Sequence, residues 1–235
     1  MSEQSKNPTL KKSDRREFIR IGTGVAGLFT LSGGIIKSFA QSCGLTAPQT
    51  SGPFYPGENQ FGENTDLTFN PANGAVAKGQ FVYLKGRVVD QNCSPIKNAN
   101  VEIWQACASG KYNSIKDPNP APLDPNFKYW AETFTNEKGE YHFKTIIPGA
   151  YPADTNWTRP PHIHFKVTCL GYRELVTQMY FKGEELNDRD LILLDLSAAE
   201  RANVIVDFRS GEPGYPKEAL VGNFEITLRS VRNTL

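Results

Sequence analysis

Short segments that are typical of strands, of which Phe81–Asp90 alternates apolar and polar residues, run through residues 81–229 of this 235-residue chain. Alternation with a period of two predicts strands that bury one face, and clusters of Gly, Pro, Asn and Asp between them predict turns. The segments predicted as strands are Phe81–Asp90, Ala99–Ala106, Tyr129–Thr135, Tyr141–Ile147, His162–Cys169, Leu175–Phe181, Val204–Phe208 and Phe224–Arg229. About eight short strands with regular turns predict an all-β fold, an antiparallel β-sandwich.

The segments around these strands are predicted to be mostly irregular. Residues 41–79 are rich in Gly, Pro, Asn and Thr, which predicts an N-terminal arm before a sandwich core at residues 80–235. Residues 113–128 are predicted to form a long loop, and Asn136-Glu-Lys-Gly139 is typical of a hairpin turn. The one predicted helix is Ser197–Ala202, with Ser197 as its N-cap.

The charge balance limits the possible partners. The chain holds 26 Lys and Arg against 25 Asp and Glu, a formal net charge of +1. No large basic block lies outside the N-terminus, so nucleic acid is not an expected partner. The length is that of one domain of ordinary size.

The first forty residues are typical of an export signal. Ser13-Asp14-Arg15-Arg16-Glu17-Phe18-Ile19 resembles the twin-arginine pattern, and a glycine-rich apolar stretch follows at Ile21–Ile36. That stretch is too short and too rich in glycine for a membrane span, and Ser38-Phe39-Ala40 offers small residues for cleavage. We therefore predict a signal peptide at residues 1–40, a periplasmic protein and no stable membrane anchor. Without residues 1–40 the formal net charge is −3, because seven of the Lys and Arg and three of the Asp and Glu are removed.

All four cysteines, Cys43, Cys93, Cys107 and Cys169, lie after the predicted signal. An even number of cysteines in an oxidising compartment is compatible with disulfides. We expect at least one bridge among the first three, because Cys93 and Cys107 flank a predicted strand and Cys43 lies in the preceding arm. The alternative is a set of small buried thiols, and the sequence leaves the pairing open.

Two of the three histidines, His162 and His164, stand two residues apart in a predicted strand. Side chains at i and i+2 leave a strand by the same face, so these two imidazoles could converge on one metal ion. A His-X-His pair alone is a moderate signal, since it also occurs on exposed strands. The third histidine, His142, is interpreted as a structural or surface residue.

Four segments carry further residues in a fixed order. They are Thr46-Ala-Pro-Gln-Thr-Ser-Gly-Pro-Phe-Tyr-Pro56, then Ala99–Ala106 continued to Gly110-Lys-Tyr112, then Pro148-Gly-Ala-Tyr151-Pro, and finally Arg159-Pro-Pro-His-Ile-His-Phe165. Together they resemble the intradiol ring-cleavage dioxygenases, non-haem iron(III) enzymes that open catechols between their two hydroxyls. The resemblance covers nearly all of residues 43–230. The ordered set Gly-X-Tyr, Pro-X-X-Tyr and Arg-Pro-X-His-X-His is highly specific.

The resemblance implies four metal ligands: the tyrosinates Tyr112 and Tyr151, and the imidazoles of His162 and His164. Two phenolates and two neutral imidazoles favour Fe(III) over Fe(II). Because tyrosine normally titrates near ~10, only a strong Lewis acid would keep two of them ionised at neutral pH. The resemblance further implies O2 as co-substrate, a cis,cis-muconate-type product, and a second role for Tyr151 as a base.

Residues near the implied ligands also match the family. Arg159 matches an arginine beside the substrate ring, where its charge could stabilise carbanion character, and Gln178 matches a glutamine in the same surroundings. Tyr55 and Trp157 either border the substrate mouth or pack at the rim or core. Trp104 is interpreted as a core residue.

The irregular arm makes the chain look more like a protocatechuate 3,4-dioxygenase subunit than like relatives with a helical dimerising segment. The full ligand set implies an iron-bearing subunit or a homo-oligomer, with a substituted catechol as substrate. Two alternatives remain. One is a non-catalytic metal- or ligand-binding β-sandwich module with the histidine pair on an exposed strand. The other is a scaffold that binds iron or copper for adhesion or storage.

Overall fold

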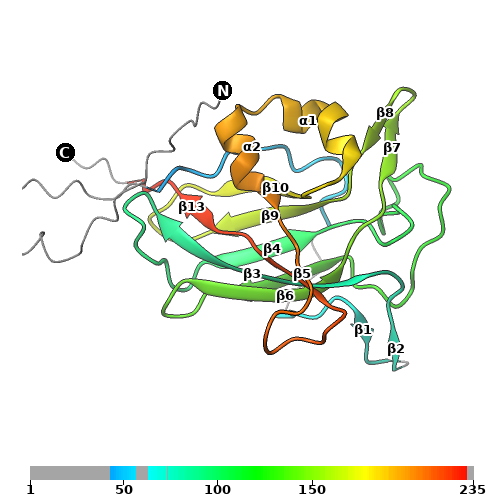
Figure 1. Cartoon of the computed structure of the whole chain (residues 1–235), viewed down its shortest axis with the longest axis horizontal. Helices are drawn as coiled ribbons and strands as arrows, with labels where there is room; N and C mark the ends of the chain where they lie inside the picture. The colour runs from blue at the N-terminus through cyan, green and yellow to red at the C-terminus, as the bar shows by residue number, and fades with distance from the viewer. Residues whose placement is uncertain (1–42, 57–62, 73, 232–235) are drawn as a thin grey trace, which may run out of the picture. The chain divides into compact units, whose positions relative to one another are not determined.

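Two β-sheets that pack face to face form the centre of the protein (Figure 1). This computed structural model describes residues 43–56, 63–72 and 74–231, which belong to one compact unit, Ala40–Leu235. The predicted signal peptide lies outside the described residues. The predicted all-β sandwich is confirmed.

The five-stranded sheet has the order β11 (Ile205–Val206), β10 (Leu175–Phe181), β9 (His162–Thr168), β4 (Asn100–Trp104) and β5 (Trp130–Phe134). In the four-stranded sheet, β3 (Phe81–Asp90) pairs with β6 (Glu140–Ile146), β12 (Leu220–Asn223) and β13 (Ile226–Leu228). Most pairs are antiparallel. The pairs β10–β11, β3–β12 and β3–β13 are parallel. Long connections precede β11 and β12, whereas β13 follows β12 after two residues and continues alongside β3 in the same direction.

Two small hairpins stand outside the main sheets. β1 (Phe69–Asn70) pairs with β2 (Ala75–Val76), so the arm predicted to be irregular holds a short hairpin. β7 (Tyr151–Asp154) pairs with β8 (Trp157–Arg159) and carries two of the predicted site residues. Strands of two to four residues are too short to show an alternating pattern, which explains why the sequence did not predict them.

The prediction of a hairpin at Asn136–Gly139 is wrong. The turn does form, with the Gly139 N–H bonded to the Asn136 carbonyl at 2.9 Å and a left-handed φ of 73° at Gly139. However, β5 before it belongs to the five-stranded sheet and β6 after it belongs to the other sheet. A turn sequence fixes local geometry and leaves open which strands pair.

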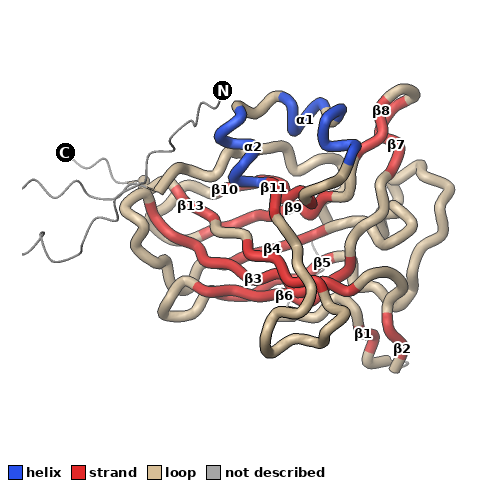
Figure 2. Tube along the Cα trace, viewed as in Figure 1, coloured by secondary structure: helices blue, strands red, loops and turns tan. Residues whose placement is uncertain are grey.

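Three helical segments lie beside β10 and β11 (Figure 2): η2 (Glu185–Arg189), α1 (Leu191–Leu194) and α2 (Ala198–Val204). The predicted helix is confirmed as α2. Its cap Ser197 forms a capping box with Glu200. The prediction of a single helix is wrong, because η2 and α1 also form. Each of them has only four or five residues, too few to show a helical period.

The core lies between the sheets, and only one face of β9 contributes side chains to it. Ile163, Phe165 and Val167 are fully buried in the main apolar cluster, where the Phe165 and Phe224 rings lie 5.0 Å apart across the sandwich. Neighbouring side chains on a strand point to opposite faces. The alternate residues of β9, His162 and His164, therefore lie on the outer face of the five-stranded sheet.

A disulfide joins Cys43 at the start of the arm to Cys93 in the turn after β3. This confirms the prediction of at least one bridge among Cys43, Cys93 and Cys107. Cys107 and Cys169 are free thiols.

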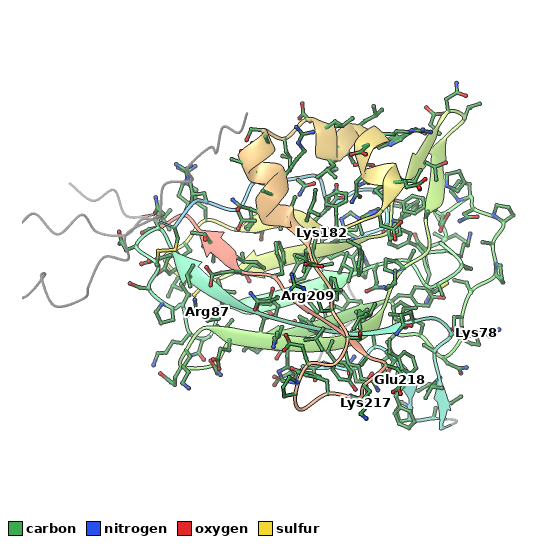
Figure 3. The ribbon with its side chains drawn as sticks, in the orientation of Figure 1. Lys78, Arg87, Lys182, Arg209, Lys217 and Glu218 are labelled. Carbon is green, nitrogen blue, oxygen red and sulfur yellow. A yellow bond between two sulfur atoms is a disulfide. The ribbon has the colours of Figure 1, made fainter. Side chains whose placement is uncertain are left out.

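Charged side chains such as Arg87, Lys182 and Arg209 project from the surface of the unit (Figure 3). Among the described residues, no helix is long and apolar enough to cross a membrane.

Candidate functional site

His162 and His164 lie on the outer face of the five-stranded sheet and are each only 2% exposed. The sheet register places Trp104 of β4 and Gln178 of β10 on either side of His164. It places Tyr180 of β10 beside His162. The Trp104 indole stacks on the His164 ring at a centroid distance of 4.8 Å and an interplanar angle of 8°. The histidine pair therefore belongs to a covered site rather than to an exposed strand.

Tyr112, in the loop that follows β4, and Tyr151, at the start of β7, reach this face from two segments that meet at a glycine. Gly110 has a left-handed φ of 81°, and a Cβ there would collide with the Ala150 carbonyl oxygen. Only glycine suits such a position, and it lets the Tyr112 loop lie directly against the start of β7. The backbone N–H of Tyr112 donates to Asp117 Oδ2 at 2.7 Å, which further fixes the loop.

The four predicted ligands form a closed ring of neighbours. The ring centroids of Tyr112 and Tyr151 are 5.5 Å apart, and those of Tyr151 and His162 are 5.7 Å apart. The centroids of His162 and His164 are 4.9 Å apart, and those of His164 and Tyr112 are 6.4 Å apart. Residues far apart in the sequence thus bring two phenols and two imidazoles together.

Unpaired polar atoms in this ring fit a metal ion. Tyr112 Oη, His162 Nε2 and His164 Nδ1 are buried and have no hydrogen-bond partner among the described residues. Burying such atoms destabilises the folded protein unless a hydrogen bond or a metal ion satisfies them. His162 Nδ1 lies 2.7 Å from the Pro160 carbonyl oxygen, which favours the tautomer with the proton on Nδ1 and a free lone pair on Nε2. No three His, Cys, Asp or Glu side chains of the described residues form a metal-binding group, so a metal here needs the tyrosines.

Burial sets the protonation of these groups in the metal-free protein. Burial, followed by the charge of Arg159, lowers the pKa of His164 to about 3 and that of His162 well below its usual value. Both imidazoles are therefore neutral at pH 7. Burial, followed by the nearby Tyr151, raises the pKa of Tyr112 well above its usual value. Burial also raises the pKa of Tyr151, and the positive charge of Arg159 opposes that rise.

Arg159, at the end of β8, is 3% exposed and lies in a network that the sequence predicted only in part. Its Nη2 donates to Gln178 Oε1 at 2.6 Å, so the two predicted residues do meet. Its Nε donates to Asp190 Oδ2 at 2.6 Å, and the Tyr180 hydroxyl lies 3.2 Å from Nη2. Asp190 and Tyr180 were not predicted. Nothing in the local sequence marks Asp190 among the several acidic residues of segment 184–195.

The N-terminal arm covers the site. Gln178 Nε2 donates to the Thr50 carbonyl at 2.8 Å, and Gln49 accepts from the Tyr180 hydroxyl at 3.0 Å. Gly52 has a left-handed φ of 66°, and a Cβ added to it would lie 3.5 Å from Cε1 of the His164 ring. The Phe54 ring lies 4.7 Å from that of Tyr112. The sequence predicted the arm and its match to the family, but not that it forms a wall of the site.

The remaining aromatic and histidine predictions have clear positions. Trp104 is buried as predicted, but it packs in a small cluster with Tyr112 and Tyr151 rather than in the main core. Tyr55 is 40% exposed and donates to Glu102 at 2.7 Å. Trp157 is half-buried beneath the Arg159 guanidinium. His142 is exposed on β6, in agreement with its interpretation as a surface residue.

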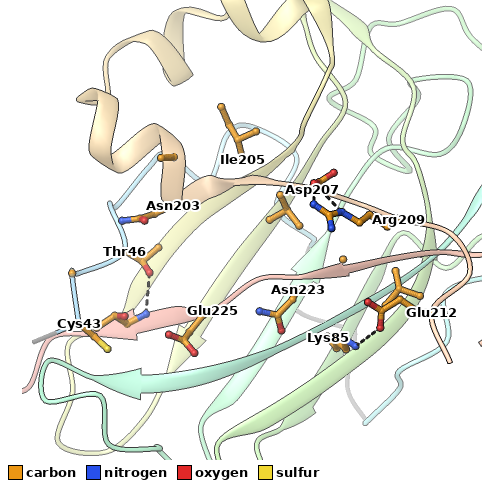
Figure 4. A pocket seen from close by; sticks show the side chains of 16 residues that line it. Cys43, Thr46, Lys85, Asn203, Ile205, Asp207, Arg209, Glu212, Asn223 and Glu225 are labelled. Carbon is orange, nitrogen blue, oxygen red and sulfur yellow. Dashed lines mark hydrogen bonds and ion pairs between the residues drawn. The ribbon is translucent and has the colours of Figure 1, made fainter. Parts of the chain in front are cut away.

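A cavity of about 550 Å³ lies elsewhere, among the arm, α2, β3 and β12–β13 (Figure 4). Its charged residues pair with one another: Lys85 with Glu212 at 3.0 Å and Arg209 with Asp207 at 2.7 Å. None of the predicted site residues lines it.

A β-sandwich that gathers two phenols and two imidazoles over the outer face of one sheet has the construction expected of the class of metalloenzyme that the sequence resembles. A family model described as Dioxygenase matches residues 50–230, and the chain belongs to the intradiol ring-cleavage dioxygenase family. Members of this family are enzymes that incorporate O2 into a catechol-type ring, and membership implies non-haem iron.

The chain is similar to the protocatechuate 3,4-dioxygenase beta chain of Burkholderia cepacia, at 40% identity over 75% of this chain and 76% of that protein. It is 30% identical to the 6-chlorohydroxyquinol 1,2-dioxygenase of Cupriavidus pinatubonensis over 76% of this chain, but spans only 64% of that longer relative. Among solved structures, the dioxygenase domain of a dioxygenase–carbohydrate-binding protein fusion from Streptomyces sp. SirexAA-E matches with a TM-score of 0.60 and 25% identity. That match covers 80% of this chain and 100% of the domain.

Proposed function

We propose that this chain is an Fe(III) intradiol dioxygenase that cleaves a substituted catechol between its hydroxyls to a cis,cis-muconate-type product. The proposed ligands are Tyr112, Tyr151, His162 and His164. The observation that carries the proposal is the buried ring of these four side chains, in which Tyr112 Oη and His162 Nε2 have no partner among the described residues.

Ferric iron, when bound, would supply the Lewis acidity that binds both diol oxygens and activates the ring toward O2. The chain supplies the remainder of the site. The neutral imidazoles present lone pairs without needing to lose a proton, whereas both phenols must lose one to bind a metal. The arm residues Gly52 and Phe54 cover the ligands and limit the access of water.

Two residues are proposed to act on the substrate. Tyr151 Oη accepts a proton from a substrate hydroxyl, a role taken from the family resemblance and compatible with the raised pKa of this phenol. Arg159 directs a fixed positive charge at the site and stabilises negative charge that develops on the ring. Gln178 holds Arg159 through the 2.6 Å hydrogen bond.

The substrate is proposed to be a substituted catechol, with protocatechuate as the first compound to test. The support is the 40% identity to a protein named as a protocatechuate 3,4-dioxygenase chain. The test is oxygen uptake by purified, iron-loaded protein with a panel of catechols, together with mass analysis of the products. The proposal predicts one O2 consumed per ring and a product that retains both oxygen atoms. Protein from iron-replete cells that holds no iron and consumes no O2 with any catechol contradicts it.

We also propose that the chain is exported to the periplasm through its twin-arginine signal. The Cys43–Cys93 disulfide supports an oxidising compartment. Cell fractionation should recover the wild-type chain from the periplasm, whereas a variant with Arg15→Lys and Arg16→Lys should remain in the cytoplasm. Equal export of both forms contradicts the twin-arginine route.

A homo-oligomer is proposed as the working state, to be tested by light scattering on the purified chain.

A further inference from the structure

A buried carboxylate, Asp190, lies behind Arg159. It is 0% exposed and sits between η2 and α1, 31 residues from Arg159 in the sequence. Its Oδ2 accepts from Arg159 Nε at 2.6 Å, and its Oδ1 accepts from the backbone N–H of Leu193 at 2.8 Å. One oxygen therefore binds the arginine while the other caps α1.

The charge pairing explains why an arginine can be buried here. Among the described residues, this is the only ion pair in which both side chains are almost completely buried, with exposures of 4% and 0%. An unpaired buried guanidinium would be costly, because it loses its hydration without compensation. Asp190 is the carboxylate that compensates it.

The geometry of the pair also fixes the plane of the guanidinium. A guanidinium is planar and presents its N–H groups in fixed directions. Asp190 holds the Nε edge, and Gln178 accepts from Nη2 at 2.6 Å. Two contacts at different nitrogens leave little freedom to rotate. The positive charge of Arg159 lowers the pKa values of Tyr151, His162 and His164. The position of the guanidinium therefore affects the proposed metal ligands.

We propose that Asp190 is a positioning residue for ring cleavage, which holds the Arg159 guanidinium in the plane that faces the substrate. The inference rests on the proposed function of the site. It differs from a purely structural role, in which Asp190 serves only to cap α1.

Two substitutions separate these roles. Asp190→Asn keeps the size of the side chain and an oxygen to cap Leu193, but its NH2 group then faces the Arg159 N–H instead of a carboxylate. Asp190→Ser keeps a capping oxygen and is too short to reach Arg159. If Asp190 positions Arg159, both variants should lose kcat by about ten- to a hundredfold with little change in KM, as for other residues that orient a functional group. Asp207→Asn, which removes an exposed carboxylate paired with Arg209, is the matched control and should leave kcat unchanged.

A double-substitution cycle shows whether Asp190 acts through Arg159. Activity of the Arg159→Met, Asp190→Asn double variant should be no lower than that of Arg159→Met alone, because the arginine to be positioned is already absent. The visible absorption band of the iron-loaded protein gives a second readout. It should shift in Asp190→Asn and stay in place in Asp207→Asn.

The same cycle in iron-free protein separates the inference from the proposed function. Each single substitution leaves one buried charge unpaired and should lower the melting temperature by roughly 10 °C, and the double variant should recover part of that loss. If wild-type protein cleaves no catechol while the melting temperatures show this coupling, the proposed function is wrong, but the interaction between Arg159 and Asp190 is confirmed. If wild-type protein cleaves catechols and Asp190→Asn keeps full kcat and an unshifted band, the positioning role is overturned. It is also overturned if Asp190→Asn lowers kcat by the same factor in the Arg159→Met background.

Discussion

At the scale of single residues, a local sequence pattern is the strongest guide to candidate site residues. His162 and His164 stand two apart on one strand and can be picked out from that spacing, whereas Tyr112 and Tyr151 are named only through the family resemblance. Asp190 cannot be picked out in either way, because its partner is 31 residues away and its neighbours include other acids. The pairing of buried charges depends on tertiary packing, which no local pattern records.

Tyr112→Phe tests the ligand role of the more deeply buried phenol. The substitution keeps the ring and its contact with Phe54 but removes the unpartnered hydroxyl. We expect iron binding weakened by at least roughly 100-fold, since even supporting residues of metal sites contribute 10- to 100-fold. Iron content and the visible colour of the purified protein measure the effect. Tyr55→Phe, which changes a tyrosine hydrogen-bonded to Glu102, is the control and should keep its iron.

The two buried histidines predict how the stability of the iron-free protein depends on pH. Their folded-state pKa values are lowered by burial, with that of His164 at about 3, whereas an unfolded histidine titrates near ~6.5. The free energy of unfolding is thus at its full value above about pH 6.5 and falls as the pH falls. The reason is that the histidines bind protons in the unfolded chain but stay neutral in the folded protein. At about pH 5 the expected loss from His164 is about 2 kcal/mol, and His162 contributes a further loss of the same sign. Chemical unfolding from about pH 7 to about pH 5 measures it, and His164→Gln should flatten the profile. A wild-type profile without slope in this range contradicts the assigned burial effect.

At the scale of elements, long strands are predicted to within a residue or two. Of the short strands, β11 and β13 fall inside predicted segments, whereas β1, β2, β7, β8 and β12 are missed. β3 and β10 begin and end at the predicted residues, because β3 alternates over most of its ten residues and β10 is a seven-residue run rich in apolar and aromatic side chains. β7 and β8 were not predicted, although they carry Tyr151 and Arg159. The prediction of site residues therefore came from their motifs and not from the elements that hold them.

Gly110→Ala tests the close meeting of the Tyr112 loop and β7. Alanine is strained at a φ of 81°, and its Cβ would meet the Ala150 carbonyl. Gly183→Ala is a matched control, with a φ of 90° and no atom within 4 Å of the added carbon. The strain shared by both should cost about 1–3 kcal/mol of unfolding free energy. Only Gly110→Ala should also lower iron content and kcat, because the loop that carries Tyr112 must move. Equal iron content in the two variants would show that the close contact does not position Tyr112.

At the scale of the whole molecule, the disulfide ties the arm to the sandwich. Cys43 and Cys93 are separated by 50 residues, and the arm continues from Cys43 to the residues that cover the ligands. The overall sandwich is predictable from the number and spacing of strands. The way the arm returns over the outer face is not, because an irregular segment has no periodicity from which to derive its path.

A double variant with Cys43→Ser and Cys93→Ser tests this anchor. Loss of the cross-link should lower the free energy of unfolding by up to about 4 kcal/mol, the chain-entropy value for a loop of this size. Because the wall formed by Gly52 and Phe54 is then less firmly held, KM for the catechol should also rise. Cys169→Ser, at a free and half-exposed thiol, is the control and should change neither quantity. A double variant with wild-type stability and KM would show that the hydrogen bonds of the arm suffice.

The placement of the site on the outer face of the sheet has an evolutionary consequence. β9 directs its odd-numbered residues Ile163, Phe165 and Val167 into the sandwich, and its histidines toward loops that contribute little to the main core. Substitutions in those loops can therefore reshape the chamber for new ring substituents at small risk to foldability. Selection on substrate choice and selection on folding act on opposite sides of a single strand.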